Sequence, residues 1–197
     1  MFDYKTVISI IAVLLTFGGY APYIRDVLQK KTTPHAFTWF VWTLASAIAC
    51  ALQISGGAGP GAWVTLAVVL ICLLIFVLSL RNGHKDITRT DVVFLILSLM
   101  ALGLWLVAKL PIWSNILIVT VDVLGFAPTI RKSWSKPYSE TLVTYKITAL
   151  RHGLSIFAQQ QYNILTTLYP VAWTAANALF SLLLILRRRV IPRENRP

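Results

Sequence analysis

Charged residues are scarce in this chain. Only 13% of its 197 residues are charged, and just seven are acidic. An average soluble domain carries about 25% charged residues, so the composition argues against a soluble domain with one core.

Features of several enzyme classes are absent as well. Cys50 and Cys72 have neither disulfide spacing nor metal-ligand spacing, and we interpret both as small packing residues. The chain has no metal-ligand pair, no Asp–Asp dyad and no nucleophile beside a base. We therefore expect that the protein is not an enzyme and that it holds neither a metal nor a cofactor.

Long apolar runs dominate instead, since 57% of the residues are hydrophobic. A transmembrane helix needs roughly 20 apolar residues, and seven stretches come close to that length or exceed it. The sequence predicts an all-α integral membrane protein with seven transmembrane helices, at residues 6–28, 36–55, 62–81, 91–108, 111–132, 140–159 and 164–186.

The net charge of +11 alternates between the two sides of these predicted helices. One side has only Lys5 and Lys109, so the positive-inside rule places the N-terminus outside and the C-terminus in the cytoplasm. The basic excess then needs no nucleic-acid partner, and we expect the tail at residues 187–189 to contact anionic lipid head groups. Short loops favour a bacterial cytoplasmic (inner) membrane. The other side carries Arg25, Lys30, Lys31, Arg81, Lys85, Arg89, Arg131, Lys132, Lys136, Arg187, Arg188, Arg189, Arg193 and Arg196.

A seven-residue motif occurs twice. Residues 19–25, Gly-Tyr-Ala-Pro-Tyr-Ile-Arg, reappear as residues 125–131, Gly-Phe-Ala-Pro-Thr-Ile-Arg. Three membrane crossings reverse the direction in which the chain runs, and one further crossing restores it. The sequence therefore predicts two parallel three-helix repeats joined by a single helix, a 3+1+3 arrangement. The domains are then the first repeat at 1–88, the linker helix at 89–109, and the second repeat with its basic tail at 110–197. Pro22 and Pro128 should kink the first helix of each repeat and act as hinges.

These features resemble the PQ-loop, SWEET and SemiSWEET transporter superfamily. The resemblance rests on proline in the first helix followed by Ile and a basic residue, on Lys-Lys-Thr-Thr at 30–33, and on the 3+1+3 plan. The eponymous glutamine is absent, because the dipeptides are Pro22-Tyr23 and Pro128-Thr129. The resemblance implies transport by alternating access. It also implies substrate contacts from a third-helix asparagine, here Asn177, and from the outer end of the second helix, here Gln53 and Gln159.

Three ionisable residues are expected deep in the membrane. Asp122 lies about 16 Å along its predicted helix, and Arg151 and His152 reach a similar depth from the other side. Intramembrane ionisable residues are functional candidates by default. One reading makes Asp122 and Arg151 a permanent ion pair; the other lets Asp122 or His152 take up a proton, or Arg151 bind an anionic substrate group. Trp42 and Trp173 complete the predicted cavity lining.

Two hypotheses of function follow from this sequence. The first is a transporter that moves a small polar solute by alternating access, with proton coupling as one option. The second is a membrane receptor or sensor on the same seven-helix fold, in which a ligand binds and nothing crosses. The sequence names neither the solute nor the direction, and it leaves open whether the chain forms a homo-oligomer.

Overall fold

The structure is a computed structural model, and it describes residues 3–30, 33–82, 87 and 89–191. Four basic residues of the predicted charge pattern lie outside the described residues, namely Lys31, Lys85, Arg193 and Arg196. So does the predicted domain boundary at residue 88. The side chain of the proposed hinge residue Pro128 also falls outside the described part, although its backbone belongs to a helix.

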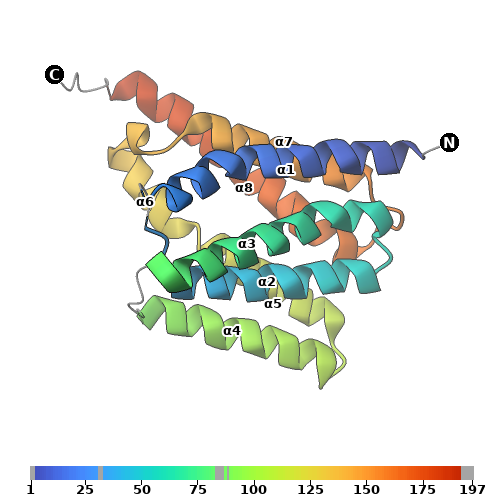
Figure 1. Cartoon of the computed structure of the whole chain (residues 1–197). Coiled ribbons are helices and arrows are strands. Elements are labelled where there is room, and N and C mark those ends of the chain that lie inside the picture. Colours follow the sequence, from blue (N-terminus) through green and yellow to red (C-terminus); the bar gives the residue numbers. More distant parts are fainter. Residues whose placement is uncertain (1–2, 31–32, 83–86, 88, 192–197) are drawn as a thin grey trace.

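The described residues form helices, with no β-strand among them. Figure 1 shows most of these helices running side by side between the two ends of a bundle. In chain order they are α1 (Tyr4–Leu28), α2 (Ala36–Ser55), the short 3-10 helix η1 (Gly59–Ala62), α3 (Trp63–Asn82), α4 (Arg89–Leu106), α5 (Pro111–Leu124), α6 (Ala127–Ser135), the 3-10 helix η2 (Pro137–Ser139), α7 (Leu142–Phe157) and α8 (Ile164–Val190).

Five segments are long and apolar enough to cross a membrane: Tyr4–Leu28, Ala36–Ser55, Gly59–Arg81, Pro111–Ser135 and Ile164–Val190. Within a bilayer a helix satisfies all its interior backbone hydrogen bonds, which is why apolar runs of this length fold as helices. The other two predicted spans are shorter as helices. α7 has 16 residues, and the apolar part of α4 is Val92–Leu106. The structure thus supports five of the seven predicted spans by length and composition.

The two copies of the repeated motif have different backbones. α1 runs without a break through Pro22, whereas the predicted helix at 111–132 is divided into α5 and α6 by a turn at Gly125 and Phe126. Proline lacks the N–H that would bond the carbonyl four residues earlier, and four residues before Pro128 is Leu124, where α5 ends. The second copy therefore interrupts its helix where the first does not.

Helix contacts follow the same pattern in the two parts of the chain. α3 packs against both α1 and α2, and α8 packs against both α5 and α7. We call α1, α2 and α3 the first group of helices, and α5, α6, α7 and α8 the second group. The two groups touch where α1 packs on α7, α2 on α5 and α8, and α3 on α7. Helix α4 packs on α2 and α5. Buried residues of α2, α4, α5 and α8 share one apolar cluster, and a second cluster lies between α2 and α3.

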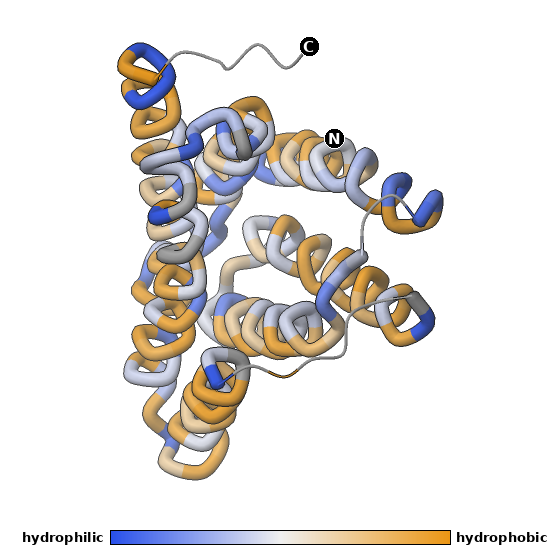
Figure 2. Tube along the Cα trace, turned by 90° about the vertical axis from the view of Figure 1, so that its left-hand side faces the viewer, coloured by the Kyte–Doolittle hydropathy of each residue, from blue (hydrophilic) through white to orange (hydrophobic). Residues whose placement is uncertain are grey.

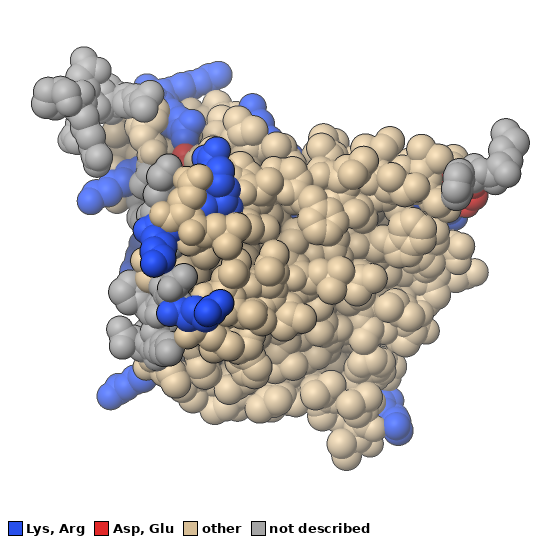
Figure 3. Space-filling model, in the orientation of Figure 1, with Lys and Arg blue, Asp and Glu red and all other residues tan. Residues whose placement is uncertain are grey.

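Charge is segregated between the two ends of the bundle. We call the end where α1, α3 and α8 finish the basic end, and the end where α1 begins the N-terminal end. Lysines and arginines gather at the basic end in Figure 3, on the left of the view. Figure 2 looks at this end and shows the most hydrophilic segments nearest the viewer, with hydrophobic residues along much of every helix. Lys5 and Lys109 are the described basic residues at the N-terminal end.

Candidate functional site

A cavity of about 530 Å³ lies between the two groups of helices. Residues of α1, α2 and α3 line one side, and residues of α5, α6, α7 and α8 line the other. The lining reaches Asp26, Thr129 and Thr141 near the basic end, so the cavity extends from the middle of the bundle toward that end. Pockets of about 300–1,000 Å³ are typical of small-molecule sites.

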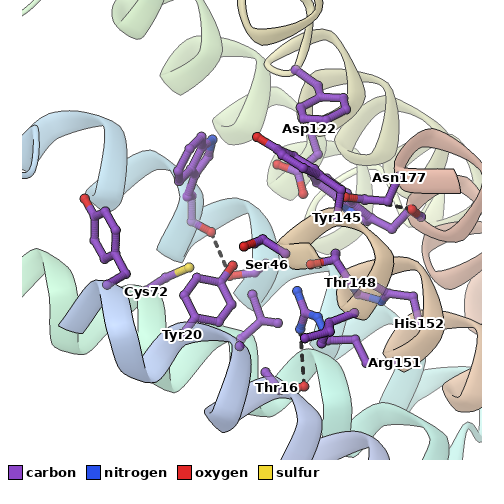
Figure 4. Close-up of a pocket in the computed structure, with 18 of the residues that line it drawn as sticks. Thr16, Tyr20, Ser46, Cys72, Asp122, Tyr145, Thr148, Arg151, His152 and Asn177 are labelled. Atoms are coloured by element: carbon purple, nitrogen blue, oxygen red, sulfur yellow. Dashed lines mark hydrogen bonds between the residues drawn. The ribbon is translucent and has the colours of Figure 1, made fainter. Parts of the chain in front are cut away.

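Six of the eight predicted substrate or coupling residues line this cavity. They are Trp42, Asp122, Arg151, His152, Trp173 and Asn177. The proposed hinge residue Pro22 lines it as well. Figure 4 labels four of these residues, Asp122, Arg151, His152 and Asn177, and shows that they come from different helices and converge on one space.

Arg151 is held in the cavity wall by α1. Its side chain is 4% exposed, Nη1 donates to Thr16 Oγ1 at 3.3 Å, and the guanidinium carbon lies 5.6 Å from the centre of the Tyr20 ring. Thr16 is itself anchored, because its hydroxyl donates to the Ala12 carbonyl at 2.8 Å. The α1–α7 contact therefore fixes the orientation of the guanidinium group.

Asp122 belongs to the opposite wall. Its side chain is 7% exposed, and the Tyr169 hydroxyl and Trp173 indole of α8 lie beside it. No ion pair within 4.0 Å joins Asp122 to Arg151, both of which the structure describes. The permanent pair considered from the sequence is therefore not formed, although both residues reach the cavity as expected.

His152 lies in an aromatic group next to Asp122. Its ring stacks on Trp173, with ring centres 6.1 Å apart and planes 19° apart, and meets the Tyr169 ring edge-on at 6.0 Å. His152 Nδ1 and Trp173 Nε1 are buried and have no hydrogen-bond partner among the described residues. Buried polar atoms of this kind are uncommon and call for a functional or solvent partner.

Asn177 lies one turn beyond Trp173 on α8. Its amide Nδ2 donates to the Trp173 carbonyl at 2.8 Å, and the residue is 2% exposed. The amide is thus attached to its own helix while it lines the cavity, as Figure 4 shows.

Gln53 and Gln159 are outside the cavity, contrary to their place in the predicted lining. Both are fully buried at the N-terminal end. Gln53 Oε1 accepts from Thr65 Oγ1 at 2.9 Å, whereas its Nε2 and both amide atoms of Gln159 have no partner among the described residues. Gln159 lies two residues beyond Phe157, the last residue of α7, so it belongs to a connection rather than to the cavity face of that helix.

The N-terminal end is closed by what we call the loop junction, formed by residues 56–61 and 159–163. Asn163 Nδ2 donates to the Gly56 carbonyl at 2.8 Å. The backbone N–H groups of Gln160 and Gln161 donate to the carbonyls of Ala58 and Gly57 at 3.0 and 3.2 Å. These bonds join the connection between α2 and α3 to the connection between α7 and α8.

Side chains of α1 brace the same junction. Lys5 Nζ donates to the Gln159 carbonyl at 2.8 Å, and Ser9 Oγ donates to the Pro60 carbonyl at 2.6 Å. Asn163 also caps α8, since its side chain accepts from the backbone N–H of Thr166 and the Thr166 hydroxyl accepts from the Asn163 N–H. The cavity is therefore closed toward the N-terminal end by hydrogen-bonded backbone.

Sequence reasoning missed Tyr20 and Thr16 as members of the site. Tyr20 belongs to the repeated motif, in which we assigned a role only to Pro22 and Pro128, as hinges, and Thr16 lies one turn before Tyr20. The signal was present, because Thr16 corresponds to Asp122 when the two copies of the motif are aligned.

The basic tail makes contacts with the protein. Arg187 Nε donates to the Trp134 carbonyl at 2.8 Å, and Arg188 donates to the carbonyls of Pro137 and Glu140 at 3.1 and 2.6 Å. These two arginines hold the connection between α6 and α7 against the end of α8. Contact of the tail with lipid head groups stays a prediction.

Comparisons with protein-family models, with curated proteins and with solved structures found no match. The site must therefore be interpreted from its own residues.

Proposed function

We propose that the protein is a membrane transporter that moves a small polar solute by alternating access. The observation that carries the proposal is a cavity that lies between two groups of helices, contains buried Asp122 and Arg151, reaches toward one end and is closed at the other. Buried charges in apolar protein are costly and are usually retained for ligands or coupling ions.

The helix contacts support a division into two three-helix repeats joined by α4. In each proposed repeat the third helix, α3 or α8, lies between the other two. Exchanging the repeats also exchanges the α1–α7 contact with the α5–α2 contact, as an internal twofold relationship requires. The two repeats would then rock against each other, opening the loop junction as the basic end closes.

The proposed location is a bacterial inner membrane with the basic end in the cytoplasm. This orientation rests on the segregation of lysine and arginine seen in Figure 3, because positive residues favour the cytoplasmic side. In that orientation the cavity faces the cytoplasm, and Arg189, exposed beside the bound Arg187 and Arg188, is available to anionic lipid.

Solute counterflow in proteoliposomes tests the proposal, after a thermal-shift screen of metabolites has identified a ligand. We expect counterflow for wild type and a loss of about tenfold or more for Asp122→Asn and Arg151→Gln, with Lys146→Gln on the exposed face of α7 as a matched control. Tight binding without counterflow would favour the receptor hypothesis. Counterflow unaffected by all the cavity variants would rule out this cavity as the transport site.

A further inference from the structure

The cavity contains one acidic and one basic residue that no direct ion pair joins. Asp122 and Arg151 are 7% and 4% exposed, yet no ion pair within 4.0 Å joins these two described residues. Figure 4 shows Ser46 and Thr148 between them in that view. We call Asp122 with its neighbours Tyr169 and Trp173 the acidic pole, and Arg151 with Thr16 and Tyr20 the basic pole.

The basic pole is suited to an anion. A guanidinium group has five N–H donors, and the hydrogen bond that the structure gives Arg151 within the described part of the chain is the one to Thr16. The remaining donors are on a side chain that lines the cavity. Arginine binds carboxylate or phosphate groups through two parallel hydrogen bonds, which is stronger than a neutral contact.

The acidic pole is suited to an ammonium group. The carboxylate of Asp122 lies beside the Tyr169 and Trp173 side chains, and Trp173 is stacked on His152. A cation placed there would meet the Asp122 carboxylate, which attracts positive charge and accepts charge-assisted hydrogen bonds from an ammonium group. His152 Nδ1 has no hydrogen-bond partner in the described part of the chain and is available for a polar group of the same ligand.

Charge balance decides which class of solute fits both poles. A solute with a single charge would give one pole an opposite charge and leave the other buried without one, and a neutral polyol would leave both without one. A third charged residue, Asp26 at the mouth, is already paired with Arg25 at 3.3 Å, so the two poles set the balance.

We propose that the solute is a small zwitterion, with its ammonium group at Asp122 and its carboxylate at Arg151. The proposal rests on the proposed function for the passage of the solute, and on the cavity alone for its chemical class. It also accounts for the absence of a direct ion pair, because the ligand would stand between the two charges.

Isothermal titration of the full chain in detergent tests this inference. The probes are γ-aminobutyrate and glycine betaine as zwitterions, choline as a cation, pyruvate as an anion and glycerol as a neutral solute. We expect a zwitterion to bind wild type most tightly, and to bind Asp122→Asn and Arg151→Gln about 10- to 150-fold more weakly. Lys146→Gln, on the exposed face of α7 and outside the cavity lining, is the matched control and should bind it as wild type does.

The variant Thr16→Asp gives a second test. Since Arg151 already bonds Thr16 Oγ1, an aspartate there would pair with the arginine and occupy the basic pole. We expect this variant to lose its preference for the zwitterion and to bind choline better than pyruvate. Retained thermal stability of each variant shows that the chain is folded.

Several results would overturn the inference. They are binding of glycerol or of a singly charged probe in preference to both zwitterions, no zwitterion binding at millimolar concentration, or zwitterion binding that Asp122→Asn and Arg151→Gln leave unchanged. Failure of the transport proposal looks different, since a zwitterion would then bind with the expected variant pattern and show no counterflow. Counterflow of a neutral solute through the same cavity would retain transport and reject the zwitterion.

Discussion

Gly56→Ala should weaken the closed state of the N-terminal end. A Cβ atom added at Gly56 would lie 2.8 Å from Leu165 Cβ and 3.1 Å from both Asn163 Oδ1 and Thr166 Cγ2. Leu165 Cβ is bonded to the backbone and cannot rotate away, so the end of α2 and the first turn of α8 must separate.

This position isolates steric overlap from backbone strain. Gly56 has φ −81° and ψ −1°, which alanine adopts freely, whereas Gly57 and Gly59 have φ 80° and 59° and would add strain of their own. Any effect of Gly56→Ala therefore reports contact between the two groups of helices at the loop junction.

The expected magnitude combines two contributions. Overpacking costs about 1–3 kcal/mol, and weakening of the hydrogen bond from Asn163 Nδ2 to the Gly56 carbonyl costs about 1 kcal/mol. Both costs fall on the closed arrangement alone. A total of roughly 2–4 kcal/mol shifts the ratio of closed to open molecules by roughly 30- to 700-fold.

Double electron–electron resonance in lipid nanodiscs measures the shift. Spin labels at Ile54 and Phe157, which are 61% and 64% exposed near the ends of α2 and α7, report the width of the N-terminal end in a background without Cys50 and Cys72. We expect a new population at longer distance for Gly56→Ala. The control Gly103→Ala on α4, where an added Cβ has no atom within 4 Å, should leave the distribution unchanged.

An unchanged distribution for Gly56→Ala, with an unchanged melting temperature, would refute the steric reasoning. A lower melting temperature without the longer distance would instead refute the idea that the loop junction opens as a gate. It would show that the loop junction stabilises the whole fold and does not act as a gate.

Two further predictions concern polar side chains at the same end. Gln159→Met removes two buried amide atoms that have no partner among the described residues, at similar volume, so it should stabilise the closed state by about 1–3 kcal/mol. Added to Gly56→Ala, it should reduce the long-distance population, and a larger long-distance population would contradict this. Asn163→Ala removes the cap of α8 and the bond to the Gly56 carbonyl, so thermal unfolding in detergent should show a loss of about 1–2 kcal/mol, and the exposed neighbour variant Tyr162→Ala, which keeps both bonds, should show a smaller loss.

The axial positions of most helices were predictable from the sequence. The apolar runs predicted at 36–55 and 164–186 correspond to α2 and to most of α8, because the length of an apolar run limits where a membrane helix begins and ends. The division between α5 and α6 was not predicted, because the predicted helix was extended through Gly125 to residue 132, although Arg131 and Lys132 make its last turn hydrophilic.

The candidate site was predictable in depth but not in lateral placement. Counting residues along each helix brings Asp122 and Arg151 to a similar depth, and both do line one cavity. It does not say which helices are neighbours. α7 packs against α1 and α5 packs against α8, so Arg151 meets Thr16 and Tyr20, whereas Asp122 meets Tyr169 and Trp173.

Gln53 and Gln159 lie outside the cavity that they were expected to line. Helical spacing placed Gln159 on the polar face of its helix, but the helix ends at Phe157 and the chain then turns into the loop junction. The spacing rule holds only while the helix continues. Gln53 remains on α2, and the Thr65 hydroxyl at the start of α3 binds it on the closed side of the cavity.

The two aligned motifs explain why the cavity charges are separate. Thr16 occupies in the first copy the position of Asp122 in the second, and Ala45 corresponds in the same way to Arg151. In the proposed twofold arrangement, the residue opposite Arg151 is thus the counterpart of Asp122 and not Asp122 itself, and the hydrogen bond from Arg151 to Thr16 is the contact that results. Had both copies kept the aspartate, each arginine position would face a carboxylate within the protein. Because only the second copy carries the charges, neither has an oppositely charged partner within 4.0 Å among the described residues, and in our proposal a ligand joins them.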